Sequence, residues 1–179
     1  MRKIALCTLL GLIVLVITVT SVSDVKAART VPHQISGILP GTVTFVELPF
    51  SDITDPYYQV GGLSVVSGQL KSLGNSNVFA FHRPVPSTSE TEPPTIADGR
   101  FFIVAANGDR INGSYEGIVI PGTEPNQLHS IVDWVITGGT GRLENATGTI
   151  QADAYVTMPD DPYALEWSVT WILDGTVNY

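Results

Sequence analysis

The chain has 179 residues, 44% of them hydrophobic, and carries 17 acidic against 9 basic residues, a net charge of −8 at pH 7. This length suits one domain with a core of its own. The acidic balance argues against a nucleic-acid partner, because a phosphate backbone would repel the protein.

The first 27 residues are expected to be a secretory signal peptide. Arg2 and Lys3 precede an uncharged apolar run, and small residues follow at Val25 to Ala27, the spacing that a signal peptidase reads. The alternative is an uncleaved membrane anchor, since the run approaches the roughly 20 residues of a spanning helix. Polar residues near its far end favour cleavage. We therefore expect a secreted or periplasmic protein with no stable membrane insertion after cleavage.

Cleavage after Ala27 would leave residues 28–179 as a single domain with six basic and sixteen acidic residues, a net charge of −10. It would also remove Cys7, the only cysteine, so disulfides, a catalytic thiolate and cysteine-bound zinc are excluded from the mature chain. His33, His82 and His129 each stand alone, with no second histidine or carboxylate at a ligand spacing on the same strand. We expect no metal and no cofactor.

The mature chain is predicted to be all-β, because apolar and polar residues alternate in runs separated by Gly, Pro, Asn or Asp. Strands are predicted at 42–48, 61–73, 78–83, 100–106, 113–120, 128–136, 147–158 and 164–174, with a short terminal piece at 176–179. With no helix to cover a sheet face, the strands must stack as two sheets or close on themselves, and closure removes exposed edges. The predicted fold is a closed antiparallel eight-stranded barrel of the calycin-like type.

Two longer connections interrupt the strands, at 49–60 and at 84–98. The second contains Pro86, Pro93 and Pro94, and proline removes the amide donors that a central strand needs. It is expected to be a solvated connector, with a lid across the barrel mouth as the alternative.

Two glycine motifs predict turns. Asn107-Gly108 predicts a tight hairpin turn with positive φ at both positions, and Asp109 is then a turn residue. The segment Gly138 to Arg142 resembles a phosphate-binding loop only superficially, because neither a Lys-Ser or Lys-Thr pair nor a helix follows it. Its glycines are expected to bend a strand at a barrel corner.

Alternation assigns whole faces of the predicted strands but not which face is luminal. Glu116, Asp133 and Tyr155 are the weak catalytic candidates. If the two carboxylates face the lumen, desolvation would raise their pKa values and suit them to acid or base chemistry. If they face outward they only solvate the barrel, which is the commoner case. Aromatic residues can fill such a barrel or line a cavity in it; the weak ligand-binding candidates are Phe79, Phe81, Trp134 and Trp167.

Several segments together resemble small secreted bacterial proteins of the allene oxide cyclase-like barrel group, which is related in fold to the plant dirigent proteins. They are Gly68 to Gly74, Ala105 to Arg110, Ile136 to Arg142, Ala146 to Gly148 and Asp174 to Val177, within a stretch from Gly61 to Val177. The resemblance implies an eight-stranded antiparallel barrel, often trimeric in the cyclases, with an apolar cavity open at one end.

Allene oxide cyclases rearrange an unsaturated fatty-acid epoxide, and dirigent proteins steer the coupling of phenoxy radicals. No motif around a functional residue of either group aligns with this chain, so the resemblance assigns no catalytic residue, and the cyclase's cysteine has no counterpart in the mature chain. The resemblance therefore predicts the fold of the chain and not its activity.

The leading hypothesis is a barrel that holds a small apolar molecule in its lumen, as a binding protein or as a cyclase-like or isomerase-like scaffold; whether it is an enzyme stays open. The alternative is a non-catalytic structural or interaction module with a solid barrel, acting through its outer surface and associating with itself or a partner. The apolar stripe Leu165, Trp167, Val169, Trp171 and Leu173 would support the alternative if it faced outward. A metal-dependent hydrolase has only scattered carboxylates in its favour.

Overall fold

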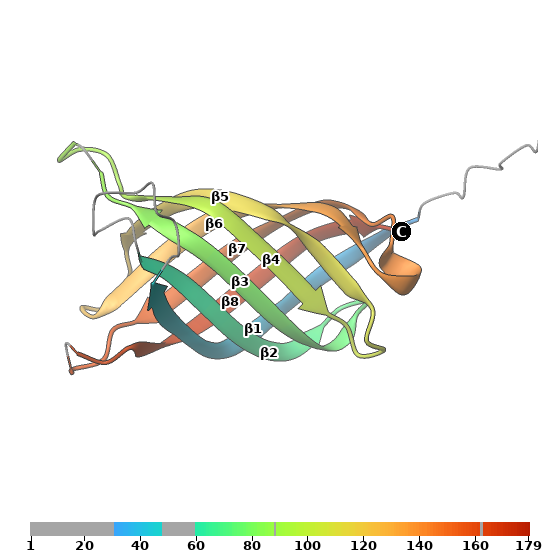
Figure 1. Ribbon diagram of the computed structural model, residues 1–179, viewed down its shortest axis with the longest axis horizontal. Helices are drawn as coiled ribbons and strands as arrows, with labels where there is room; N and C mark the ends of the chain where they lie inside the picture. The colour runs from blue at the N-terminus through green and yellow to red at the C-terminus, as the bar shows by residue number, and fades with distance from the viewer. Residues whose placement is uncertain (1–30, 48–59, 88, 162) are drawn as a thin grey trace, which may run out of the picture.

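The computed structural model describes residues 31–47, 60–87, 89–161 and 163–179 (Figure 1). The predicted signal peptide and nearly all of the connection at 49–60 lie outside these ranges. Among the described residues, no helix is long and apolar enough to span a membrane.

Eight antiparallel strands close into a barrel in which each strand pairs with the next and β8 pairs with β1, as predicted (Figure 1). The strands are β1 (Pro32–Glu47), β2 (Val60–Leu70), β3 (Gly74–Val85), β4 (Thr95–Val104), β5 (Arg110–Pro121), β6 (Gln127–Gly139), β7 (Thr147–Thr157) and β8 (Glu166–Asn178). A 3₁₀ turn, η2 (Gly141–Leu143), joins β6 to β7.

Strand boundaries differ from the prediction where glycine or proline occurs inside a strand. β1 begins at Pro32, ten residues before the predicted start, and continues through Pro40, whose missing amide is tolerated within the ladder. β3 and β4 extend into the predicted connector at 84–98, where Pro84 pairs with Ile96. Only the part from Pro86 to Pro94 lies outside the strands. In the closed barrel every strand has pairing partners on both sides. These pairings outweigh the low strand propensity of the proline and glycine residues in these segments.

The apolar stripe on β8 faces the lumen. Trp171, Val169 and Leu173 are almost fully buried, whereas Leu165 precedes the strand and is 71% exposed. The sequence left the orientation of this stripe open, and the outward orientation that would have supported an interaction module is not the one found. The hydrophobic effect explains the inward orientation: alternate residues of β8 carry large apolar side chains, and the strand turns the face that carries them toward the core.

Side chains fill the half of the barrel in which β8 ends and β1 begins. The residues that pack there are fully or almost fully buried and mostly aliphatic: Ile35, Leu39, Leu70, Ile103, Ile111, Ile150, Leu173 and Val177. This half is a solid core of the kind found in small barrels. At the opposite end the inward side chains leave space unfilled.

The two glycine motifs meet at the filled end. In the hairpin between β4 and β5 the Gly108 amide donates to the Ala105 carbonyl at 2.9 Å, and only Gly108 in this turn has positive φ. The predicted hairpin is present, but positive φ at Asn107 was wrong, because the turn has one more residue than a primed two-residue turn. The Asp109 carboxylate accepts hydrogen bonds from Asn107 Nδ2 at 2.6 Å and from Arg142 Nε at 3.3 Å. Through Arg142, the connection between β6 and β7 is therefore hydrogen-bonded to the turn between β4 and β5.

Candidate functional site

The unfilled end of the barrel contains an apolar cavity of about 260 Å³. It lies where β1, β3 and β7 end and β2, β6 and β8 begin. Its lining is mostly apolar and includes two buried serines and one histidine: Val43, Phe45, Ser64, His82, Pro84, Pro94, Val119, Leu128, Ser130, Ala154, Val156, Trp167, Val169 and Trp171. None of the described residues in this lining is Asp, Glu, Lys or Arg. Such a lining suits an uncharged, largely apolar occupant.

Four aromatic rings separate the cavity from the filled half of the barrel. Trp134 stacks on Phe101 with ring centroids 4.1 Å apart and contacts Trp171 edge-on at 5.3 Å. Tyr115 contacts both indoles. The indole nitrogens of Trp134 and Trp171 are buried with no hydrogen-bond partner among the described residues. Aromatic clusters of this kind form a rigid, well-packed floor.

His82 is the ionisable residue among the described residues that line the cavity. Its Nδ1 lies 2.9 Å from the hydroxyl oxygen of Tyr115, and the two rings meet edge to face with centroids 5.9 Å apart. The two residues lie on β3 and β5, with β4 between them. Their side chains meet because Gly99 of β4 has no side chain: a Cβ there would lie 2.7 Å from Cγ of Tyr115.

A bulge in β4 sets this arrangement. The registers of β4 with β3 and with β5 both shift near Asp98, which has a φ of 56°. An extra residue in one strand bends it locally and redirects nearby side chains. Here it gives Gly99 the inward position over which the Tyr115 ring passes.

Burial governs the ionisation of both residues. Desolvation lowers the pKa of His82 from 6.5 to about 4 and raises the pKa of Tyr115 above its ordinary value. Both side chains are therefore neutral at physiological pH. The hydrogen bond between them leaves His82 Nε2 as the ring nitrogen without a partner among the described residues.

The three catalytic candidates from the sequence lie on the outer face of the barrel. Glu116 and Asp133 are exposed and sit opposite each other on β5 and β6. An acid or base role for Glu116 and Asp133 required that they face the lumen, and they do not. Tyr155 stacks on His129 at 4.4 Å, and His129 Nε2 lies 2.7 Å from Asp153 Oδ1, so these three residues form a group outside the lumen.

The four ligand-binding candidates divide between the two faces. Phe79 stacks on Phe102 on the outside with centroids 4.6 Å apart, and Phe81 lies on that side of β3 as well. Trp134 is inside, in the aromatic floor, and Trp167 lines the cavity. Sequence reasoning did not single out His82, Tyr115, Ser64 or Ser130 as a group. One feature of the sequence could have placed His82 inside the barrel: along β3 it shares a strand face with the apolar residues Val78 and Ala80.

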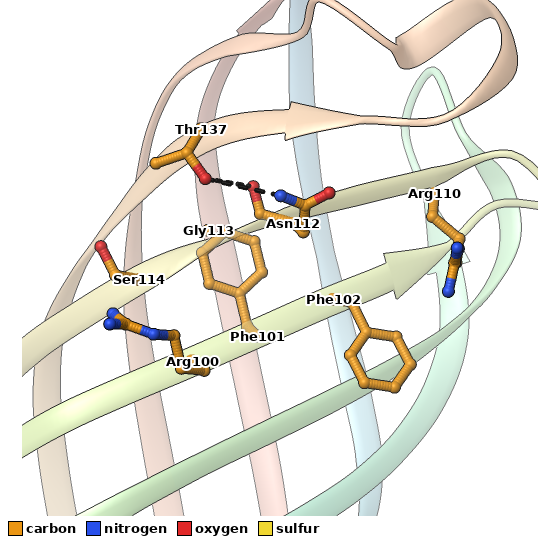
Figure 2. Close-up of a pocket in the computed structure, with 8 residues that line it drawn as sticks. All are labelled: Arg100, Phe101, Phe102, Arg110, Asn112, Gly113, Ser114 and Thr137. Carbon is orange, nitrogen blue, oxygen red and sulfur yellow. Dashed lines mark hydrogen bonds between the residues drawn. The ribbon is translucent and has the colours of Figure 1, made fainter.

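A larger hollow, of about 590 Å³, lies on the outer surface of β4, β5 and β6. Figure 2 shows the side chains of Arg100, Phe102 and Arg110 around it, with Asn112 hydrogen-bonded to Thr137. It is a shallow depression above small residues of the sheet. We take the smaller luminal cavity as the candidate site because it is enclosed by the barrel wall and excludes water from a ligand's surface.

The described residues include no group of three or more His, Cys, Asp or Glu side chains that could hold a metal ion. No protein-family model, curated protein or solved structure matches the chain. The site must therefore be interpreted from its own geometry.

Proposed function

We propose that the protein holds a small apolar molecule in the open half of its lumen, as a binding protein or as a scaffold on which such a molecule rearranges. The observation that carries this proposal is the apolar cavity above the aromatic floor. A barrel that serves only as a rigid module gains stability from a filled lumen, since an empty apolar cavity forfeits packing contacts. Leaving one half unfilled is consistent with an occupant.

A catalytic role would depend on shape more than on acid-base groups. Among the described residues, His82 is the ionisable side chain that lines the cavity, and it and its hydrogen-bond partner Tyr115 are both neutral. A pocket that holds one reactive conformer lowers the entropic part of a barrier without a charged group. Binding is the primary function proposed, and rearrangement of the bound molecule is its extension.

Native mass spectrometry of protein purified from its own host tests the proposal directly, with an apolar adduct of small mass as the expected result. Titration with small apolar molecules provides a second readout, because Trp167 and Trp171 line the cavity and their fluorescence should respond. The matched variant is Ala154→Leu, which places a larger side chain in the cavity. Absence of an adduct, together with no fluorescence response in the unmodified protein, would contradict the proposal.

The outer surface supports a second candidate, a module that binds another protein. Phe102 and Val65 are 40% and 42% exposed, and Phe102 stacks on Phe79. Exposed apolar groups that adjoin one another mark contact surfaces. Sedimentation of the protein and of Phe102→Ser at high concentration tests this candidate. A monomer in both cases, with no partner recovered from the host, would leave it without support.

We further propose that the protein works outside the cytoplasm and shares the allene oxide cyclase-like barrel type. The basic and apolar pattern of the first 27 residues supports export, and the closed eight-stranded barrel is compatible with the resemblance. The intact mass of the mature protein tests export, since cleavage after Ala27 predicts a chain that starts at Ala28.

A further inference from the structure

We propose that the luminal ligand is a neutral molecule with one hydroxyl or carbonyl oxygen, bound by a hydrogen bond to Nε2 of His82. This inference rests on the proposed function and specifies its ligand class. It is carried by the position of His82 as the one imidazole in a lining whose other described residues are apolar or aromatic except for Ser64 and Ser130, and by the hydrogen bond that orients its ring.

The orientation of the imidazole follows from its neighbours. Tyr115 contacts Nδ1, and the ring edge formed by Cε1 and Nε2 faces Gly62, the residue of β2 that pairs with His82. A Cβ at position 62 would lie 3.3 Å from each of these two atoms, so the glycine keeps that edge clear of a side chain. Nε2 has no hydrogen-bond partner among the described residues, and His82 lines the cavity.

The neutral state of the histidine decides what kind of group it can bind. When the Tyr115 hydroxyl donates to Nδ1, Nε2 carries the proton and donates to a carbonyl or hydroxyl oxygen. When Nδ1 carries the proton and donates to Tyr115, Nε2 accepts from a hydroxyl. A neutral alcohol can therefore be bound in either tautomer, and a ketone in one of them.

A carboxylate is disfavoured by the same lining. No Lys or Arg lines the cavity among the described residues, and burial holds the pKa of His82 near 4, so no cation is available at neutral pH. Transfer of an ionised carboxylate from water into such a site carries a large desolvation penalty. A free fatty acid is thus a poor candidate for an occupant whose acid group enters the lumen.

The size of the cavity limits the ligand further. Filling about three quarters of 260 Å³, the packing density of protein interiors, accommodates roughly ten carbon-sized atoms. This corresponds to a monoterpenoid or a small phenol. A ligand of this size buries its apolar skeleton against Trp167, Val169 and Val156 and presents its oxygen to His82.

Three probes with one carbon skeleton test the inference: limonene, a hydrocarbon; perillyl alcohol; and perillic acid, which is ionised at pH 7. Their affinities for the full-length chain and for His82→Phe would be measured by tryptophan fluorescence and calorimetry. We expect the alcohol to bind about three- to tenfold more tightly than limonene, the usual gain from one neutral hydrogen bond. The acid should bind about a hundredfold more weakly than the alcohol.

In His82→Phe the advantage of the alcohol should disappear while limonene binding is kept. His129→Gln, which alters a histidine on the outer face, is the matched control and should behave as the unmodified protein. Equal affinity for alcohol and hydrocarbon, retention of the preference in His82→Phe, or tightest binding of the acid would overturn the inference while leaving luminal binding intact. Failure of all three probes to bind, with no adduct in protein from its host, would instead contradict the proposed function.

Discussion

Arg83 and Asp98 form an ion pair on the outer wall of the barrel, with Nη2 of the arginine 2.7 Å and Nε 3.0 Å from Oδ2 of the aspartate. Arg83 directly follows His82, and Asp98 directly precedes Gly99, over which the Tyr115 ring lies. The ion pair therefore joins the two strands at the bulge that positions the polar group of the cavity. Changes at the outer wall should be detectable at the site inside it.

Asp98 should tolerate Asn far better than Val. The ion pair is exposed, and such pairs contribute about 0–1 kcal/mol, so Asp98→Asn should lower the free energy of unfolding by less than about 1 kcal/mol. A β-branched residue at a φ of 56° is strained, and Asp98→Val should cost about 1–3 kcal/mol more. Urea unfolding of the two variants measures the difference. Equal stabilities would show that the bulge does not hold this backbone conformation in solution.

The stability of the fold should increase with pH between about 4 and 6.5. The pKa of His82 is about 4 in the folded chain and 6.5 as its ordinary value, so within this window the unfolded state binds more protons than the folded state. The free energy of unfolding therefore rises with pH, by up to about 3 kcal/mol across the window. Denaturant unfolding at a series of pH values measures this slope.

His82→Gln should flatten that slope. Asp109 does not interfere, because its pKa is lowered from 3.8, chiefly by its hydrogen bond with Asn107, and the stability linked to it is lost only below this window. An unchanged slope in His82→Gln would rule out His82 as its source.

Enlargement of two buried alanines on β7 should lower the stability of the fold to different extents. Ala154 lines the cavity, whereas Ala152 is fully buried in the core and does not. Ala152→Leu should lower stability by about 1–3 kcal/mol through overpacking. Ala154→Leu should change stability by less than about 1 kcal/mol, because its added atoms enter open space, and it should weaken binding of the limonene probe. Thermal unfolding compares the pair, and equal destabilisation would mean that the lumen is filled at both levels.

The contact between Asp109 and Gly141 predicts that the effects of Gly141→Ala and Asp109→Ala on the free energy of unfolding are not additive. Gly141 has a φ of 59°, and a Cβ there would collide with Oδ1 of Asp109. Gly141→Ala should therefore cost about 1 kcal/mol for its backbone and displace the carboxylate from Asn107 and Arg142 as well. Asp109→Ala has already lost the contacts of the carboxylate with Asn107 and Arg142. The double variant should therefore be more stable than the sum of the two single effects predicts, by about 0.5 kcal/mol or more. Additive effects in urea unfolding would contradict the link.

The architecture could be predicted from local patterns. Period-two alternation and turn-forming residues between the runs are properties of neighbouring residues, and they indicated eight antiparallel strands and a closed barrel. The same patterns misplaced the starts of β1 and β4, because Pro40 and the residues before Gly99 are held in strand by partners distant in the chain.

The site is a matter of tertiary structure. Alternation separates Glu116 from Tyr115 and Asp133 from Trp134 but does not say which member faces inward; packing of Tyr115 and Trp134 into one aromatic floor decides it. His82 and Tyr115 are 33 positions apart and on strands that do not pair. The pairing of β4 with both β3 and β5, the bulge at Asp98 and the absent side chain of Gly99 bring them together. By itself the sequence determined a barrel, since periodicity is local; the cavity and its polar group depend on contacts between distant strands, which the tertiary structure alone specifies.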